Sequence, residues 1–121
     1  MDFKIIIKDD ENEKLVREVY DNKIISAYIT LKQGMPEMGD KIKFKLNDLY
    51  ALAGFCSPYL ISFQSNTGYK GNGRYKLKSS EEKSRERDFN EMKGQALFVL
   101  GIIFKILNQN LDNKKVIFEV V

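Results

Sequence analysis

The alternation of apolar and polar residues predicts a chain made mostly of β-strands. In "KIKFKL" (41–46), three apolar residues alternate with three lysines, which is typical of a strand with one buried and one basic face. Other segments are dense in β-branched and aromatic residues, a composition that also favours strands. These are "FKIII" at 3–7, "IISAYITL" at 24–31, "YLISF" at 59–63, "RYKLK" at 74–78 and "VIFEVV" at 116–121.

Residues 14–20, "KLVREVY", fit two patterns. Leu15, Val16, Val19 and Tyr20 follow a helical spacing, whereas the alternate sets 15, 17, 19 and 16, 18, 20 suit a strand. The turn-forming "DNK" (21–23) joins this segment directly to 24–31. So short a connection favours a β-hairpin between the two segments.

Two helices are predicted. In the first, Asn47 is a good N-cap, "DLYALA" (48–53) follows, and Gly54 is a plausible stop. The second begins at Ser79, because Glu82 completes a capping-box spacing. Its apolar residues then recur at intervals of three and four: Phe89, Met92, Ala96, Val99, Leu100, Ile103 and Leu107.

These elements define an α+β domain. The expected order is ββββαββαβ, with about seven strands in a mostly antiparallel sheet packed on one long C-terminal helix, and with one short helix. The 121 residues are predicted to form a single domain, residues 1–121, because this length is usual for one hydrophobic core.

The long helix carries an indication of quaternary structure. Residues 96–107, "ALFVLGIIFKIL", are apolar nearly all round, and Phe98, Ile102 and Ile106 form a second apolar line beside the first. Such a helix must be covered on more than one side. The cover is either a second layer of the same chain or a symmetric partner, and Gly94 and Gly101 would let another backbone approach closely. We predict a homo-oligomer formed through Ala96–Leu107.

Composition narrows the class of protein. The chain is 43% hydrophobic and 31% charged, as folded proteins are. The single cysteine, Cys56, excludes an intramolecular disulfide and favours a reducing compartment, so we expect a cytoplasmic protein. The longest apolar segment, 96–107, is well short of a bilayer span, and no membrane association is expected.

The sequence offers little catalytic chemistry. It has no histidine, which removes the commonest general base and transition-metal ligand. "DDENE" (9–13) is better explained as a solvated turn than as a cation loop, because it lacks the glycine and the final glutamate of such loops. Cys56 has no base to activate it and is expected to lie in the core. We therefore predict a non-enzymatic protein without metal or cofactor, although Tyr–Lys or Lys–Ser pairs stay open.

Positive charge gathers in one window. No acid lies between Asp48 and Glu81, and the second half of that window holds Lys70, Arg74, Lys76 and Lys78. Its centre, "GYKGNGRYK" (68–76), is explained structurally as two strands around the turn Gly71-Asn72-Gly73. Alternatively, its glycine N–H groups form an anion nest beside the cations, and its tyrosines stack on bases. The expected ligand residues are Tyr69, Lys70, Gly71, Gly73, Arg74, Tyr75 and Lys76, with Lys41, Lys43 and Lys45 as a secondary basic face.

Two hypotheses for function follow. The first is a small binding protein that recognises a phosphate-bearing ligand, either single-stranded nucleic acid or a nucleotide, through this basic hairpin. The alternative is an inhibitor or adaptor that blocks a larger partner protein. Its contact surface would be the same hairpin or "QGMPEMGD" (33–40), where exposed Met35 and Met38 would offer adaptable apolar contacts.

Overall fold

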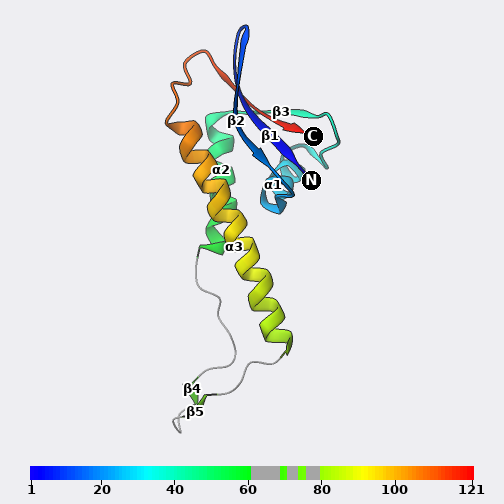
Figure 1. Cartoon of the computed structure of the whole chain (residues 1–121), viewed down its shortest axis with the longest axis vertical. Helices are drawn as coiled ribbons and strands as arrows, with labels where there is room; N and C mark the ends of the chain where they lie inside the picture. Colours follow the sequence, from blue (N-terminus) through cyan, green and yellow to red (C-terminus); the bar gives the residue numbers. More distant parts are fainter. Residues whose placement is uncertain (61–68, 71–73, 76–79) are drawn as a thin grey trace.

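The computed structural model describes residues 1–60, 69–70, 74–75 and 80–121, with the backbone alone for the two short pairs in the middle. The fold is α+β, as predicted, with an antiparallel sheet and a long C-terminal helix (Figure 1). The elements, in chain order, are β1 (Phe3–Asp9), β2 (Asn12–Val19), α1 (Lys23–Gln33), β3 (Lys41–Phe44), α2 (Leu46–Cys56), a 3₁₀ turn (Ser57–Tyr59), β4 (Tyr69–Lys70), β5 (Arg74–Tyr75), α3 (Ser80–Leu107) and β6 (Lys115–Val120).

The main sheet has four strands rather than about seven. Its order is β2-β1-β6-β3 and every neighbouring pair is antiparallel. Strands β1 and β2 form a hairpin around Asp10 and Glu11, so the strand interpretation of residues 14–20 is confirmed, but their partner is 3–9 and not 24–31. The two short strands β4 and β5 form a separate ribbon.

Residues 24–31 are the main error of the sequence prediction, because they form helix α1. Asn22 is its N-cap, and its side-chain oxygen accepts a hydrogen bond of 2.9 Å from the Ile25 N–H. The buried residues Ile24, Ile25, Tyr28 and Ile29 repeat at helical spacing. Their β-branched composition is overridden because this face packs into the core.

The boundary between β3 and α2 also differs from the prediction. The strand ends at Phe44, Lys45 is the N-cap of α2, and Leu46 is an exposed helical residue rather than a buried strand residue. Asn47 therefore lies inside the helix. Gly54 does not stop it, because α2 continues to Cys56. The Asp48 carboxylate decides the start, since it accepts a 2.8 Å hydrogen bond from the Lys45 N–H.

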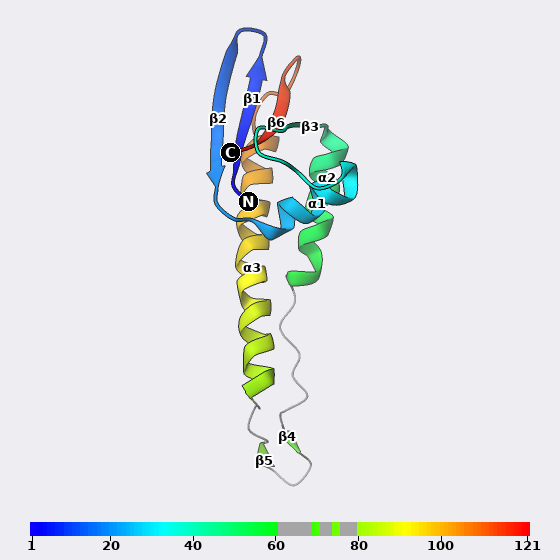
Figure 2. The ribbon, with the colours of Figure 1, turned by 90° about the vertical axis from the view of Figure 1, so that its right-hand side faces the viewer.

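Helix α3 confirms the predicted long helix from Ser80 onward, while Ser79 lies outside the described residues. The predicted strand 59–63 is wrong at its start, because Tyr59 ends a 3₁₀ turn, and its residues 61–63 lie outside the described residues. The C-terminal half of α3 packs beside α2 and α1 on one face of the sheet, and its N-terminal half extends beyond the sheet (Figures 1 and 2). Ile102 and Ile106, from the second apolar line, are buried by this same chain. Part of the cover that we expected from a partner is therefore internal.

Candidate functional site: a groove between strand β2 and helix α3

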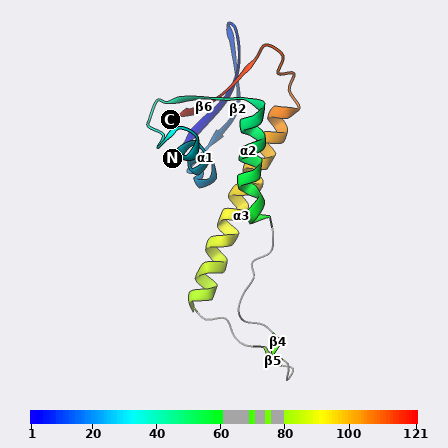
Figure 3. The ribbon, with the colours of Figure 1, turned by 180° about the vertical axis from the view of Figure 1, so that it is seen from behind.

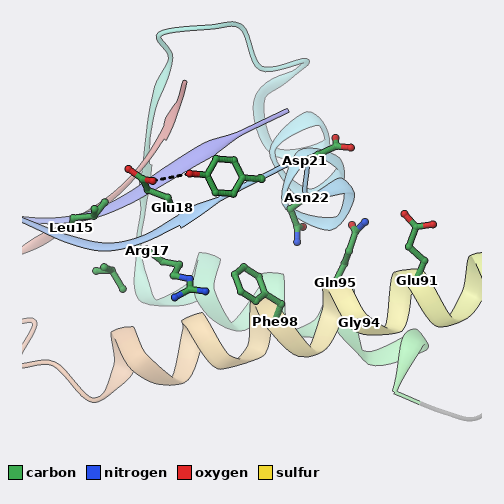
Figure 4. Close-up of a pocket in the computed structure, with 11 residues that line it drawn as sticks. Leu15, Arg17, Glu18, Asp21, Asn22, Glu91, Gly94, Gln95 and Phe98 are labelled. Carbon is green, nitrogen blue, oxygen red and sulfur yellow. Dashed lines mark hydrogen bonds between the residues drawn. The ribbon is translucent and has the colours of Figure 1, made fainter.

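A groove of about 920 Å³ lies between β2 and α3 (Figure 4). Residues 15–18 and 20–22 form one wall. Glu91, Gly94, Gln95 and Phe98 of α3 form the other. A hydrogen bond of 2.9 Å from the Lys23 N–H to the Gln95 side-chain oxygen joins the two walls, so the start of α1 holds α3 in place.

The groove follows the edge of the sheet. Strand β2 is the first strand in the order β2-β1-β6-β3, and consecutive residues of it line the groove irrespective of which sheet face they belong to. The register of β2 shifts at Val16, which has no partner on β1 because Arg17 pairs with Ile5 and Leu15 with Ile6. This bulge interrupts the alternation of the two faces, so neighbouring residues can line the same groove. Because β2 is an edge strand, the groove lies beside a strand with one unpaired side. Part of this edge is already occupied, because the Lys105 ammonium donates a 3.3 Å hydrogen bond to the Val16 carbonyl.

The middle of the groove is aromatic and its ends differ. The Arg17 guanidinium lies 5.1 Å from the centre of the Phe98 ring, a cation–π contact between the two walls. Leu15 lies at one end, and Asp21 and Glu91 lie at the other (Figure 4). The groove therefore has an aromatic centre, a mixed end with Leu15, Arg17 and Glu18, and an end with the two carboxylates of Asp21 and Glu91.

Two hydrogen bonds fix the side chains at the end of β2 and just after it, in this wall of the groove. The Tyr20 hydroxyl donates a 2.9 Å hydrogen bond to Glu18, and that bond together with the charge of Glu18 raises the pKa of Tyr20. The pKa of Asp21 is lowered, mainly by its 2.9 Å hydrogen bond from the Met1 amino group. Gly94 leaves space in the facing wall, because no described atom lies within 4 Å of where its Cβ would be.

The predicted hairpin site falls partly outside the described residues. Gly71, Gly73 and Lys76 lie there, as does Gly68. The four remaining residues form β4 and β5, whose register pairs Tyr69 with Tyr75 and Lys70 with Arg74. The predicted return strand is thus confirmed at its first two residues, and the two cations occupy paired backbone positions.

The secondary basic face lies on β3 and at the start of α2. Lys41 and Lys43 are exposed on β3, where Lys41 forms a 3.8 Å ion pair with Glu119. Lys45 is the extended N-cap of α2, and it lines one small pocket together with Lys43, Lys114 and Lys115. Strand β3 belongs to a different sheet from β4 and β5, so the basic residues do not extend one surface.

Met35 and Met38 are exposed, as the alternative hypothesis predicted, with 82% and 81% of their surface accessible. The loop that carries them is ordered by its own hydrogen bonds. The Glu37 N–H donates to Asp40 at 2.9 Å, and the Gly39 N–H donates to the Val120 carbonyl at 2.9 Å. Gly34 and Gly39 adopt positive φ angles of 100° and 91°, which favour glycine.

The clearest titratable cluster in the described chain is structural. Tyr28, Lys32 and Asp48 meet between α1 and α2, with 2.7 Å from the Tyr28 hydroxyl to Asp48 and 2.7 Å from the Lys32 ammonium to the same oxygen. Burial opposes ionisation of Asp48, yet hydrogen bonds from Lys32, the Lys45 N–H and Tyr28 lower its pKa. Burial and Asp48 raise the pKa of Tyr28 to about 12, which is the wrong direction for an activated nucleophile.

Cys56 is buried, as predicted, and burial raises its pKa to about 11. A thiol in this environment stays protonated near neutral pH and is a poor nucleophile. Among the described residues, no group of three or more histidine, cysteine or carboxylate side chains is arranged to hold a metal ion.

Sequence reasoning missed the groove, although one signal was present. A glycine inside a helix weakens it, so Gly94 indicates either a packing or a functional reason. What could not be seen is that residues 14–20 lie at the sheet edge opposite this glycine.

Comparison with protein-family models, with curated proteins and with solved structures finds no match. In the ranges that the structure describes, none of the helices combines the length and the apolar character needed to cross a bilayer.

Proposed function

We propose that this chain is a protein-interaction module, an adaptor or inhibitor that binds an extended segment of a partner protein along β2. The observation that carries this proposal is the position of the groove along the edge of the sheet. An extended peptide can hydrogen-bond to such an edge as an added strand, while its side chains enter pockets on either side. The exposed Met35 and Met38 further support a protein partner.

The aromatic centre and the acidic end of the groove define the chemistry of the segment. Its apolar residues would pack in the centre, against Phe98 and into the space left by Gly94. A lysine or arginine would reach the acidic end at Asp21 and Glu91. The expected partner segment therefore alternates apolar residues and carries a basic residue near one end.

The probe for this proposal is a displayed library of ten-residue peptides, selected on the immobilised protein. Enriched peptides are synthesised in two further forms, with backbone N-methyl groups on either the odd or the even residues. An added strand bonds to β2 through alternate N–H groups only. One N-methylated series should therefore lose binding at least about tenfold, whereas the other should bind like the parent peptide.

Substitutions in the groove test whether the peptide binds there. Glu91→Lys should weaken binding of basic enriched peptides about tenfold, and Phe98→Ala should weaken all of them. Glu37→Lys, a charge reversal outside the groove, is the matched control. Equal binding by both N-methylated series, or undiminished binding by Phe98→Ala, would overturn the proposal.

A second candidate function is recognition of a phosphate-bearing ligand, single-stranded nucleic acid or a nucleotide, by residues 68–76. The supporting observation is the β4–β5 register, which pairs Lys70 with Arg74 and Tyr69 with Tyr75. Paired cations and paired tyrosines are suitable for a phosphate backbone and its bases.

A titration with a single-stranded oligonucleotide and with ATP at several salt concentrations tests this candidate. A polymer ligand gives a steep salt dependence, because counterion release grows with the number of phosphates neutralised. Arg74→Ala combined with Lys76→Ala should abolish binding, whereas Lys41→Ala combined with Lys43→Ala, on the other sheet, should not. Unchanged binding by the first pair would exclude this candidate.

A further inference from the structure

The outward face of α3 carries an unusual pattern of large and small residues. Opposite its buried face, exposed residues recur alternately four and three positions apart: Asn90, Gly94, Leu97, Gly101, Phe104 and Asn108. This is the heptad spacing of a helix that packs along another helix. Leu97 and Phe104 keep 53% and 66% of their surface exposed, so the described part of the chain leaves this face largely uncovered.

The two glycines on this face have no role in packing the described chain. Apart from their chain neighbours and the backbone of α3 itself, no described atom lies within 4 Å of a Cβ built on Gly94 or on Gly101, and neither residue has a positive φ angle. Glycine is the least favourable helix residue after proline. A close approach by a second backbone would account for both positions.

The order of large and small residues along this face is complementary to itself when a second copy of α3 runs antiparallel. Consider two copies of α3 that run antiparallel and cross at Val99. A residue that lies a given number of positions before Val99 then faces the residue of the second copy that lies the same number of positions after it. Leu97 then faces Gly101 of the second copy, and Phe104 faces Gly94, so every large side chain meets a glycine. Asn90 faces Asn108, which places a polar pair at each end of the seam and can fix the register. A parallel pair would instead oppose large residues to large ones and glycine to glycine.

The residues flanking the seam agree with this arrangement. On one side, Phe98 lies near Phe98 of the second copy, close to the two-fold axis. On the same side, Glu91 lies near Lys105 of the second copy, an opposite-charge pair that symmetry repeats. On the other side, Leu100 lies near its own equivalent. Both flanks are thus apolar at the centre, and the flank with Phe98 carries opposite charges toward its ends.

We infer that this face binds a second copy of the chain as an antiparallel α3–α3 pair, giving a two-fold symmetric dimer. This inference is argued separately from the proposed peptide function, although both surfaces use Gly94, Phe98 and Glu91. The dimer places its contacts on the outward face, while β2 residues such as Leu15 and Arg17 remain outside the seam.

The mass of the full chain in solution, followed by light scattering from 1 to 100 µM, tests this inference. Wild type should be dimeric in the upper part of this range. Gly101→Leu should weaken dimerisation by at least about tenfold, because the new side chain collides with Leu97 of the second copy. The same substitution should raise the thermal stability of the monomer, since leucine is the better helix former and the site is open.

A paired exchange separates this geometry from a general effect of either substitution. Leu97→Gly combined with Gly101→Leu in one chain again sets glycine against leucine, and the dimer should return to within about threefold of the wild-type dissociation constant. A monomeric wild type at 100 µM would overturn the inference. So would a Gly101→Leu protein that dimerises like wild type, or a paired exchange as weak as the single substitution.

Discussion

Two faces of the same helix are both apolar, and the fold treats them differently. The inward face of α3 buries Ala96, Val99, Ile102, Ile103 and Ile106. Figure 3, seen from behind the view of Figure 1, shows α2 lying beside the C-terminal half of α3. The outward face leaves Leu97 and Phe104 exposed around two glycines. Apolar character alone therefore does not tell which residues stabilise the monomer. The inward face contributes to the free energy of unfolding, and the outward face is available for association.

The largest expected difference comes from truncating neighbouring residues on the two faces. Ile103→Ala should lower the free energy of unfolding by about 3 kcal/mol, because it leaves a cavity in a packed core. Phe104→Ala should change it by less than about 0.5 kcal/mol in the monomer, because that side chain is already exposed. Urea unfolding at a concentration below dimer formation measures both, and similar losses would contradict the comparison.

The second-largest expected effect concerns the contact between α1 and α2. Asp48→Asn removes the charge that Lys32 and Tyr28 share, and it leaves the Lys32 ammonium without its ion pair. We expect a loss of about 2 kcal/mol at pH 7. Because the pKa of Asp48 is lowered in the fold, wild type should lose this advantage as the pH falls through that pKa, and the two unfolding curves should converge in acid.

The pH dependence of stability in alkaline solution tests whether water reaches Cys56 and Tyr28 in the folded protein. The pKa of Cys56 rises from 9.0 to about 11 and that of Tyr28 from 10.0 to about 12, so in each case the unfolded chain ionises first. Stability should be complete below about pH 9 and fall as the pH rises toward 12, by on the order of 2 kcal/mol for each group. Cys56→Ala should flatten the profile between pH 9 and 11, and an unchanged profile would show that the thiol is hydrated.

The smallest expected effect distinguishes open glycines from constrained ones. Gly54→Ala on α2 should raise the free energy of unfolding by about 0.5–1 kcal/mol, because no described atom lies near its Cβ position and alanine favours the helix. Gly39→Ala should lower it by a similar amount, since its φ angle is 91°. Thermal unfolding of both variants gives the two signs, and equal signs would refute this distinction.

The sequence by itself determined the elements whose signals are local. The spacing of apolar residues in α3 gave its face, the lysine alternation gave β3 up to Phe44, and a hairpin was expected around Gly71 to Gly73 because glycine permits the necessary turn. Cys56 was predicted to be buried because the sequence has no histidine to activate it as a nucleophile, and it is buried. The α+β class followed from these elements together.

Only the tertiary structure decided what depends on residues far apart in the chain. Residues 24–31 became a helix because their face packs into the core, although their β-branched composition favours a strand. The partner of β2 is set by the whole sheet rather than by the nearest turn, and its edge position creates the groove opposite α3. Which apolar face of α3 is covered is likewise a matter of packing, because periodicity identifies a face but not the element that lies against it.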